Sequence, residues 1–368
     1  MTGALYAQIY DTLRERIVEG EWEVGDRLPS QEELTGEFSV SAITVKRALD
    51  MLRDEGFVTR RPRIGTVVVS RAPKWEGPAG KLPLIGYVVP GFNDAFGTRI
   101  LGGLLDASAT QAHVVVAASH GDSGQEEQLI EEQVSRGIDG LVLQPSSSQY
   151  IPPAVASLIG ERFPLVILDR TLDGTPVSTV TSDNVEGGRL AAEHLFERGH
   201  ADLAFVMPSN PVSTLDQRLR GIVDAHAAHR VRLDPEHVFA ELGSSVPGSG
   251  VTAEADVERL AAFLAEHPEV TGCVAAEYGL ARLVFDAGRR LGRSVPEDLS
   301  VVSFDAPANF SDATVPLTHV DQDQWAIGEH VFALLQQQLR EPGTIAQDTV
   351  PVRMVDGEST APAPRAAH

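Results

Sequence analysis

The sequence has almost no cysteine and no long apolar run, and each absence excludes a class of protein. Cys273 is the single cysteine among 368 residues, so the chain forms no internal disulfide and no zinc site built on two or more cysteines. No apolar run approaches the ~20 residues that span a bilayer. The first residues place Asp11, Arg14 and Glu15 where a signal peptide would need an apolar core. We therefore expect a soluble protein of the reducing cytoplasm that makes no membrane contact.

Positive charge is also scarce. The chain has 30 Lys and Arg against 52 Asp and Glu, a net charge of -22, so as a whole it should repel nucleic acid and anionic membranes. The deficit is uneven. Residues 1–75 carry 11 basic and 12 acidic side chains, which leaves -21 for the remainder, and residues 41–74 carry 8 basic against 3 acidic. A basic patch inside a neutral N-terminal segment is thus the feature to explain.

The chain divides into zones of different pattern. Residues 1–70 indicate three helices and a hairpin, and residues 71–82, "RAPKWEGPAGKL", have the Pro, Gly and charge of a linker. Residues 83–355 alternate short apolar strands with amphipathic helices, which is typical of a parallel sheet covered on both faces. Residues 356–368 are small and Pro-rich, and we expect them to be disordered. The fold class is therefore α/β with a separate helical N-terminal domain.

The N-terminal zone carries clear helix signals. Four apolar residues recur at helical spacing before Gly20, namely Leu5, Ile9, Leu13 and Ile17. Ser30 with Glu33 forms a capping box for a second helix. Ser41 is a good N-cap for a third helix, which Gly56 ends. The spacing predicts a helix-turn-helix.

The third helix and the segment after it predict a DNA-binding surface. One face of this helix is apolar and should face the core, through Val45, Ala48, Leu49 and Leu52. Its N-terminal half projects Ala42, Ile43, Lys46 and Arg47 outward. "FVTR", the turn "RPRIG" and "TVVV" form a two-stranded basic wing that carries Arg61 and Arg63. Such a helix offers its first residues to the major groove, and wing arginines reach phosphates or a minor groove.

This arrangement resembles the GntR-type winged helix-turn-helix of bacterial transcription regulators, through "GDRLPSQEEL", "FSVSAITVKRALDMLRDEGFV" and "RRPRIGTVV" over about residues 4–69. The resemblance implies DNA-facing positions at Ser30, Glu32, Ser41, Ala42, Ile43, Thr44, Lys46 and Gly65. The family commonly has Arg where this chain has Glu32 and Ala42, so we do not expect a typical operator sequence; a glutamate could instead accept from cytosine N4. The alternative is a packing module with a solvated charged face.

In the large zone, polar residues follow the expected strands. Ligands of parallel sheets collect at the carboxyl ends of strands, and those ends carry Asn93, Asp94, Pro145, Ser146, Asp169, Arg170, Asp183, Asn184, Glu277 and Asp305. Carboxylates and Asn bond to sugar hydroxyls, Arg bridges two of them, and rings such as Phe92 or Phe96 cover the apolar face of a sugar. The pattern favours a sugar-binding cleft.

Residues 83–355 also resemble the two-lobed effector domain of LacI-family repressors, itself similar to periplasmic sugar-binding proteins. The motifs include "GIDGLVLQPS", "PLVILDR", "VTSDNVEGGRLAAEHLFERGH", "LDQRLRGIVDA" and "VPEDLSVVSFD". The resemblance implies ligand contacts at Asp94, Phe96, Asp169, Arg170, Asp183, Arg218, Asp305 and Gln322. The family's "ND" is Glu277–Tyr278 here, so an atypical ligand is expected at Glu277. Each of these residues could alternatively serve as a helix cap, a turn former or a surface ion pair.

The lobes are expected as about 83–181 with the helix near 323–340, and about 182–312 with the last strand, "DTVPVRM". The combination of head and body resembles arabinose-repressor-type regulators. It implies a homodimer that binds double-stranded operator DNA and responds to a small sugar, most simply as a repressor that the sugar releases. The alternatives are a sugar-binding protein or an enzyme on the same fold without a regulatory role.

No catalytic set, metal site or cofactor is expected. "GDSG" at 121–124 lies between a strand and a helix, where it reads as an N-cap and not as a protease nucleophile. His113, His120 and Asp122 lie at irregular spacing and are expected to be solvated, and Cys273 lies in an apolar strand as a core residue.

Overall fold

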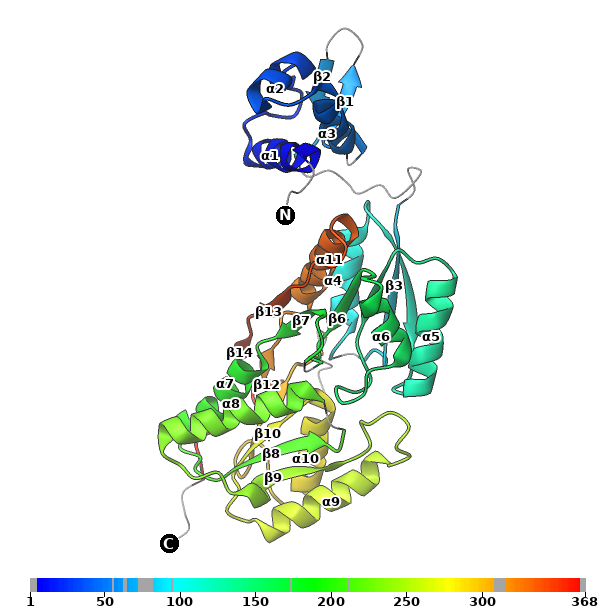
Figure 1. The fold of residues 1–368 in the computed structure, drawn as a ribbon. Helices are drawn as coiled ribbons and strands as arrows, with labels where there is room; N and C mark the ends of the chain where they lie inside the picture. Colours follow the sequence, from blue (N-terminus) through cyan, green and yellow to red (C-terminus); the bar gives the residue numbers. More distant parts are fainter. Residues whose placement is uncertain are drawn as a thin grey trace. The chain divides into compact units, whose positions relative to one another are not determined.

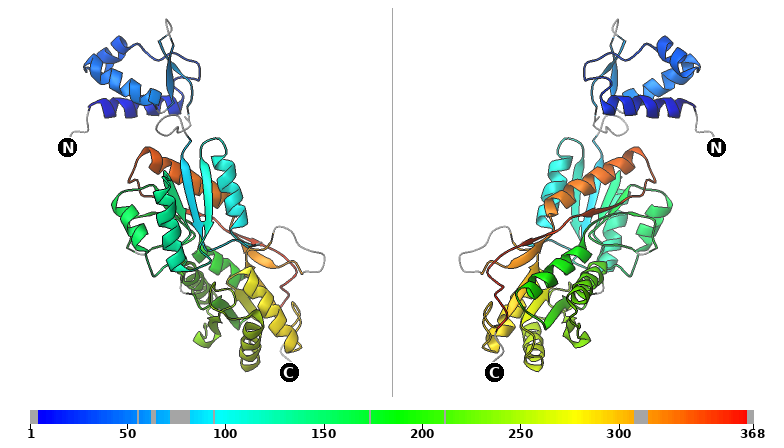
Figure 2. Two further views of the ribbon diagram at one scale, coloured as in Figure 1. Left: turned by 90° about the vertical axis from the view of Figure 1, so that its right-hand side faces the viewer. Right: turned by 90° about the vertical axis from the view of Figure 1, so that its left-hand side faces the viewer.

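The computed structural model describes residues 5–54, 56–61, 65–71, 82–93, 95–172, 174–210, 212–307 and 315–364. The chain forms two compact units, a head within residues 5–71 and a body within residues 84–364 (Figures 1 and 2). Within the described ranges, no helix combines the length and apolar character needed to cross a membrane.

The head contains helices α1 (Leu5–Glu19), α2 (Gln31–Phe38) and α3 (Ala42–Asp54), followed by the antiparallel hairpin of β1 (Val58–Arg61) and β2 (Gly65–Val68). Gly20 and Gly56, just beyond α1 and α3, take positive φ angles that only glycine adopts readily. The predicted apolar face of α3 lies in a small core, to which the described part of the head contributes Ile9, Leu13, Ile17, Leu28, Leu34, Val45, Ala48 and Leu52. The predicted helix-turn-helix and wing are therefore confirmed.

The body consists of two lobes, each a sheet between two layers of helices (Figure 1). Lobe one has the strand order β13-β7-β6-β5-β3-β4. Its elements are β3 (Leu84–Val89), α4 (Thr98–Ser108), β4 (His113–Ala118), α5 (Ser123–Ser135), β5 (Gly140–Leu143), α6 (Pro153–Gly160), β6 (Leu165–Leu168), β7 (Ser178–Ser182), α11 (Gln324–Arg340) and β13 (Gln347–Val350).

Lobe two has the order β14-β12-β11-β10-β8-β9, parallel except for β14. Its elements are α7 (Asn184–Glu197), β8 (Leu203–Pro208), α8 (Ser213–His229), the short 3-10 helix η1 (Pro235–His237), β9 (Val238–Leu242), α9 (Ala253–Glu266), β10 (Gly272–Ala275), α10 (Tyr278–Arg290), β11 (Ser300–Phe304), β12 (Thr318–Asp321) and β14 (Arg353–Val355). Strands β10 and β11 are buried along their whole length, because helices cover both faces, and Cys273 lies in this core.

The sequence did not predict strands β9 and β12, and the assignment of the last predicted strand to lobe two was wrong. β9, "VFAEL", lies at a sheet edge and was missed although it begins with three apolar residues, whereas β12, "THVD", is mostly polar and shows no apolar run. "DTVPVRM" is not one strand of lobe two. It divides at Pro351, and β13 pairs with β7 in lobe one while β14 pairs with β12 in lobe two.

The expectation of a disordered tail is also wrong for residues 356–364. Ser359 is fully buried, and its hydroxyl donates to Val301 O at 2.6 Å and accepts from Thr318 N at 2.9 Å. His200 Nε2 lies 3.0 Å from Ala361 O. Small side chains let this segment lie against lobe two and satisfy main-chain groups there, which composition alone does not indicate.

The chain crosses between the lobes at three places, between β7 and α7, between β12 and α11, and between β13 and β14. Gln322 and Asp323 form the second crossing. Three adjacent crossings make a natural hinge, and they set the polar ends of the parallel strands of both lobes toward one cleft.

Candidate DNA-binding and effector sites

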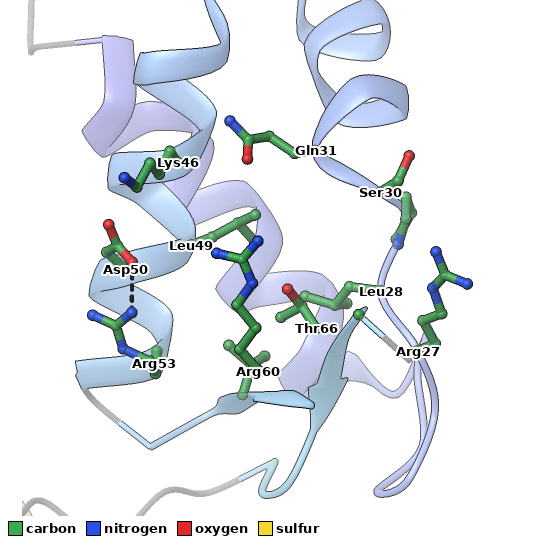
Figure 3. Close-up of a pocket in the computed structure, with 13 residues that line it drawn as sticks. Arg27, Leu28, Ser30, Gln31, Lys46, Leu49, Asp50, Arg53, Arg60 and Thr66 are labelled. Carbon is green, nitrogen blue, oxygen red and sulfur yellow. Dashed lines mark hydrogen bonds and ion pairs between the residues drawn. The ribbon is translucent and has the colours of Figure 1, made fainter. Parts of the chain in front are cut away.

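The head has a shallow basic hollow of about 220 Å³ between the start of α2, one side of α3 and the hairpin (Figure 3). Four cationic side chains line it, namely Arg27, Lys46, Arg53 and Arg60. Asp50 is the acidic residue of this lining, and its carboxylate lies 2.7 Å from Arg53 Nη1. The hollow therefore carries a positive surplus suited to phosphate. Sequence reasoning did not select Arg27, because it precedes the helix signals.

Two serines cap the helices that frame this surface. Ser30 Oγ accepts from Glu33 N at 3.2 Å while Ser30 N donates to Glu33 Oε2, which is the predicted capping box. That main-chain hydrogen bond holds the pKa of the Glu33 carboxyl below its usual range. Ser41 Oγ accepts from Thr44 N at 3.3 Å at the start of α3. The caps fix two helix N-termini, whose free N–H groups attract anions.

On α3, Ala42, Ile43, Lys46 and Arg47 are exposed, as predicted. Ile43 is 80% exposed, which is unusual for a large apolar side chain and fits contact with a thymine methyl group. Arg47 lies over the Tyr6 ring of α1, 4.0 Å from its centroid, and Lys46 lines the hollow, so the two cations have different surroundings. Thr44, half-buried, shares a 2.8 Å hydrogen bond with Ser41 Oγ.

The remaining predicted DNA-facing residues are spread over α2 and the hairpin. Glu32 is exposed in the first turn of α2, and Arg61 is exposed at the end of β1. Gly65 begins β2 with φ +110°, and a Cβ there would lie 2.9 Å from Arg27 Nε. Any other residue at 65 would thus be strained and would press on the hollow. Arg63 lies outside the described residues.

The body encloses a cavity of about 740 Å³ at the carboxyl ends of the strands of both lobes. Seven of the predicted ligand residues line it, namely Phe96, Asp169, Arg170, Arg218, Glu277, Asp305 and Gln322. Phe92 lines it as well, so the cavity combines aromatic faces with charged groups. This volume suits a small ligand.

Asp169 and Asp305 occupy equivalent positions in the two lobes. Each follows a buried strand, takes a positive φ (62° and 56°) and is almost fully buried. A positive φ is unfavourable for aspartate and is typical of functional sites. Asp169 accepts from Gln144 Nε2 at 3.1 Å and pairs with Arg170. Burial raises the pKa of Asp305 to about 6, although Arg218 and hydrogen bonds from glutamines lower it.

Arg218, on α8, is buried and fully engaged. Its Nε donates to Asn184 Oδ1 at 2.8 Å, its Nη2 donates to Gln322 Oε1 at 3.1 Å, and its guanidinium lies 3.9 Å from the Phe304 ring centroid. Burial lowers the pKa of Arg218 to about 10, so it stays charged at neutral pH. It therefore organises the floor of the cavity through Gln322, whose amide in turn donates to Asp305.

Glu277 and Arg170 have buried polar atoms without protein partners. Glu277 Oε1 and Arg170 Nε are both shielded from solvent and make no hydrogen bond. Burial raises the pKa of Glu277, although Ser245 and Arg218 act against it. Buried polar atoms are normally paired, so each of these calls for a partner from outside the protein.

The structure corrects one predicted ligand contact. Asp183 does not line the cavity. Its Oδ1 accepts from Glu186 N at 3.0 Å and caps α7, because the carboxylate sits where the first free N–H groups of that helix need an acceptor. Asp94 lies outside the described residues. Asn93 caps its own turn by accepting from Ala95 N and Phe96 N.

Sequence reasoning missed residues that support the site. Gln324 Nε2 donates to Asp305 Oδ1 at 3.0 Å and to Ala95 O, and so joins both lobes. Ser213, at the start of α8, accepts from Thr171 N at 2.9 Å across the cleft. Gln144 binds Asp169 as described above. Only the three-dimensional fold brings these polar residues beside the predicted ones.

The two parts of the chain match known families. Residues 5–68 match the model described as bacterial regulatory proteins of the gntR family, and residues 192–360 match the periplasmic binding protein-like domain. The head is therefore similar to gntR-family regulatory proteins, and the second lobe with its adjoining segments is similar to periplasmic binding proteins. The predicted family resemblance is thereby confirmed.

Relatives align with most of this chain. It is 26% identical over 341 residues to the arabinose metabolism transcriptional repressor of Geobacillus stearothermophilus, an alignment that covers 91% of each chain. The expected alternative of an enzyme has no support among the named relatives, which are transcription regulators.

Solved structures show the same fold. A LacI-family regulator from Enterococcus faecium with bound ribose has a TM-score of 0.62 at 24% identity, covering 76% of this chain and 99% of that one. The lac repressor dimer bound to operator has a TM-score of 0.64 at 21% identity, covering 77% and 96%. The body therefore has the same two-lobed α/β fold as these solved proteins.

Proposed function

We propose that this protein is a cytoplasmic, homodimeric repressor of carbohydrate genes, released from its operator when a small sugar enters the cavity of the body. The observation that carries this proposal is the cavity of about 740 Å³ lined by carboxylates, arginines and aromatic rings, in a chain that also has a basic reading head. The chemistry of both surfaces supports a protein that couples a metabolite to DNA.

The ligand class follows from the groups that lack partners. Glu277 Oε1 needs a donor and Arg170 Nε needs an acceptor. A hydroxyl group both donates and accepts, so adjacent hydroxyls on one neutral molecule satisfy both groups. Phe92 and Phe96 supply flat apolar surfaces for the C–H face of a ring. A monosaccharide or a comparable polyol fits this set.

The DNA-binding role is assigned to the head. In a dimer, two copies of α3 would enter successive major grooves about 10 bp apart, and the hairpins would follow the backbone. Lys46, Arg60, Arg61 and Arg63 are the proposed cations, and Ser30, Glu32, Ser41, Ala42, Ile43 and Thr44 the proposed neighbours of bases and phosphates. Because the body holds most of the negative charge, it should weaken non-specific DNA binding and leave recognition to the head.

The decisive experiment measures binding of the full chain to fragments of its own promoter region by fluorescence anisotropy, with and without each of a panel of pentoses, hexoses and nucleosides. We expect specific binding to one fragment and its loss with one sugar. If a sugar binds the body but no fragment is bound, the protein is a sugar-binding protein without a regulatory role. If the sugar is converted to product, the protein is an enzyme.

A further inference from the structure

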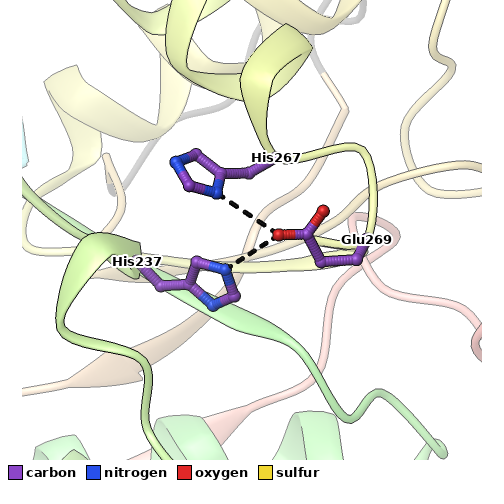
Figure 4. Close-up of side chains that lie close together, drawn as sticks. All are labelled: His237, His267 and Glu269. Carbon is purple, nitrogen blue, oxygen red and sulfur yellow. Dashed lines mark hydrogen bonds and ion pairs between the residues drawn. The ribbon is translucent and has the colours of Figure 1, made fainter.

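A group of three potential metal ligands lies in lobe two, at the opposite end of the strands from the cavity. Among the residues that the structure describes, His237, His267 and Glu269 are the one group of this kind whose ligand atoms lie within 4.8 Å of one another (Figure 4). His237 ends η1 just before β9, and Glu269 lies shortly before β10. These are the amino ends of parallel strands, whereas the cavity lies at the carboxyl ends, so the sheet separates the two.

The distances between the ligand atoms suit one small cation. Glu269 Oε1 lies 3.1 Å from His237 Nε2 and 3.3 Å from His267 Nδ1. A tetrahedral zinc ion with bonds of about 2.0–2.2 Å holds its ligand atoms roughly 3.3–3.5 Å apart. The 3.3 Å separation is that of a coordination shell and the 3.1 Å separation is slightly shorter, and Figure 4 shows both rings directed at the same carboxylate oxygen.

The surroundings hold the ligands in place while leaving one side open. His237 is buried, and its ring meets that of His267 edge-on with centroids 5.2 Å apart. The His267 ring also packs on Phe263, and the His267 main chain caps α9. The Glu269 side chain is 46% exposed, so an ion can approach from solvent. Its own N–H and the two histidines keep the pKa of Glu269 below the usual range, and the carboxylate is thus ready to bind.

We propose that His237, His267 and Glu269 bind a divalent transition-metal ion of the zinc class, with a water completing the shell. Two imidazoles and one carboxylate favour such an ion over Mg²⁺ or Ca²⁺, which prefer all-oxygen shells. The ion would join the start of edge strand β9 to the turn between α9 and β10. Its effect is to stabilise lobe two, and it takes no part in effector or DNA binding.

The test uses the full chain, stripped of metal with a chelator and dialysed. Co²⁺ is followed by its visible absorption and Zn²⁺ by calorimetry. We expect one equivalent of ion per chain and a higher melting temperature with Zn²⁺. Loss of an outer-shell partner alone weakens metal binding about 10–100-fold, so His267→Ala and Glu269→Gln should each weaken it by more than about a hundredfold.

The matched control is His330→Ala, which removes a histidine–carboxylate pair, His330 Nδ1 to Asp348 Oδ2 at 2.7 Å, that includes no second histidine. It should bind the ion as the wild type does. His237 is buried, so His237→Ala is interpreted only if its circular dichroism is unchanged; Glu269→Gln, at an exposed position, decides in any case. Absence of stoichiometric binding, or binding that survives Glu269→Gln and His267→Ala, would overturn the proposal.

Discussion

Burial disfavours the charged form of three side chains that line the cavity, namely Asp305, Glu277 and Arg218. It raises the pKa of Asp305 to about 6, raises that of Glu277, and lowers that of Arg218 to about 10. Desolvation disfavours the ionised form in every case. A ligand that donates hydrogen bonds to the carboxylates favours their charged forms again, so binding and ionisation should be linked.

Effector affinity should therefore depend on pH through Asp305. A polyol donates to the ionised carboxylate, and below pH 6 the ionised fraction falls about tenfold per unit. Affinity should be nearly constant above pH 7 and about tenfold weaker at pH 5. Calorimetry with the sugar identified by the promoter assay checks this. The Asp305→Asn variant should bind more weakly at pH 7 and lose the part of the pH dependence that is centred near pH 6, although Glu277 can still contribute a dependence of its own. A profile identical to the wild type would exclude Asp305 as the titrating group.

Glu277→Gln should change stability and binding in opposite directions. The amide keeps the size of the side chain but removes a buried charge, so the ligand-free protein should melt at a higher temperature. The same change replaces a charge-assisted hydrogen bond worth about 1.5–3 kcal/mol, so the sugar should bind roughly 10-fold to 100-fold more weakly. Thermal melts and calorimetry measure the two effects. Unchanged affinity would place Glu277 outside the ligand contacts.

In the head, Lys46→Ala should weaken binding to all DNA sequences to a similar degree. Each phosphate neutralised contributes about 0.9 to the slope of log affinity against log salt, so the slope should become shallower by about that amount. Anisotropy titrations at several salt concentrations measure it. The control is Arg289→Ala, which removes a cation that is 76% exposed on the body and pairs with Asp286. Equal slopes for Lys46→Ala and wild type would count against a phosphate contact.

At the scale of elements, close packing of helices positions Arg218. Helices α7 and α8 lie side by side (Figure 1), and glycines allow the approach. A Cβ at Gly221 would lie 1.9 Å from Val185 O, and one at Gly188 would lie 2.0 Å from Arg218 O. Both obstacles are main chain and cannot rotate away. The α7–α8 contact therefore fixes the helix that carries Arg218 and Ser213.

Gly221→Ala should force α7 and α8 apart. Overpacking of a core costs about 1–3 kcal/mol, and main-chain obstacles place this site at the upper end, so the melting temperature should fall by roughly 5 °C or more. Sugar affinity should fall as well, because Arg218 moves with α8. Gly160→Ala is the control, since nothing lies within 4 Å of its added Cβ. If Gly221→Ala is as stable as Gly160→Ala, helices α7 and α8 can move apart without cost.

At the scale of the whole molecule, hydrogen bonds already join the lobes at the cleft. Ser213 N donates to Ser148 Oγ at 2.9 Å, Thr171 N donates to Ser213 Oγ, and Arg170 Nη1 donates to Thr214 Oγ1 at 3.2 Å. The cavity lies between the same lobes, so binding of the proposed sugar there would change how firmly the lobes are held together. A ligand that favours one arrangement of the lobes shifts a dimer between states of different DNA affinity.

This coupling must be reciprocal. If the sugar weakens operator binding by some factor, saturating operator DNA must weaken sugar binding by the same factor, because both factors express one coupling free energy, typically 1–3 kcal/mol or roughly 5–150-fold. Calorimetry of the sugar with and without operator, set beside anisotropy of the operator with and without sugar, checks the equality. If the sugar releases DNA but its own affinity is the same with and without operator, the release does not result from coupling between the two binding sites.

Local patterns in the sequence were enough to predict the secondary structure of the head and most of the cavity lining. Capping boxes, helix periods and glycine stops act over a few residues, so Ser30, Ser41, Gly20 and Gly56 marked the head correctly. Polar residues after apolar strands also marked most of the cavity, because parallel strands bring their carboxyl ends to one edge. Expectations failed where the signal was weak, as at the mostly polar strand β12 and the small, Pro-rich tail.

Tertiary structure alone decided which polar residues share a site. Asp183 and Asp305 both directly follow a buried strand, yet Asp183 caps a helix and Asp305 lines the cavity, because the geometry after each strand differs. Gln324 and Ser213 lie at the site because of contacts between distant parts of the chain. His237 contacts Glu269, which also contacts His267, although about thirty residues separate His237 from the other two. Such contacts depend on how elements pack, and no local pattern in the sequence specifies them.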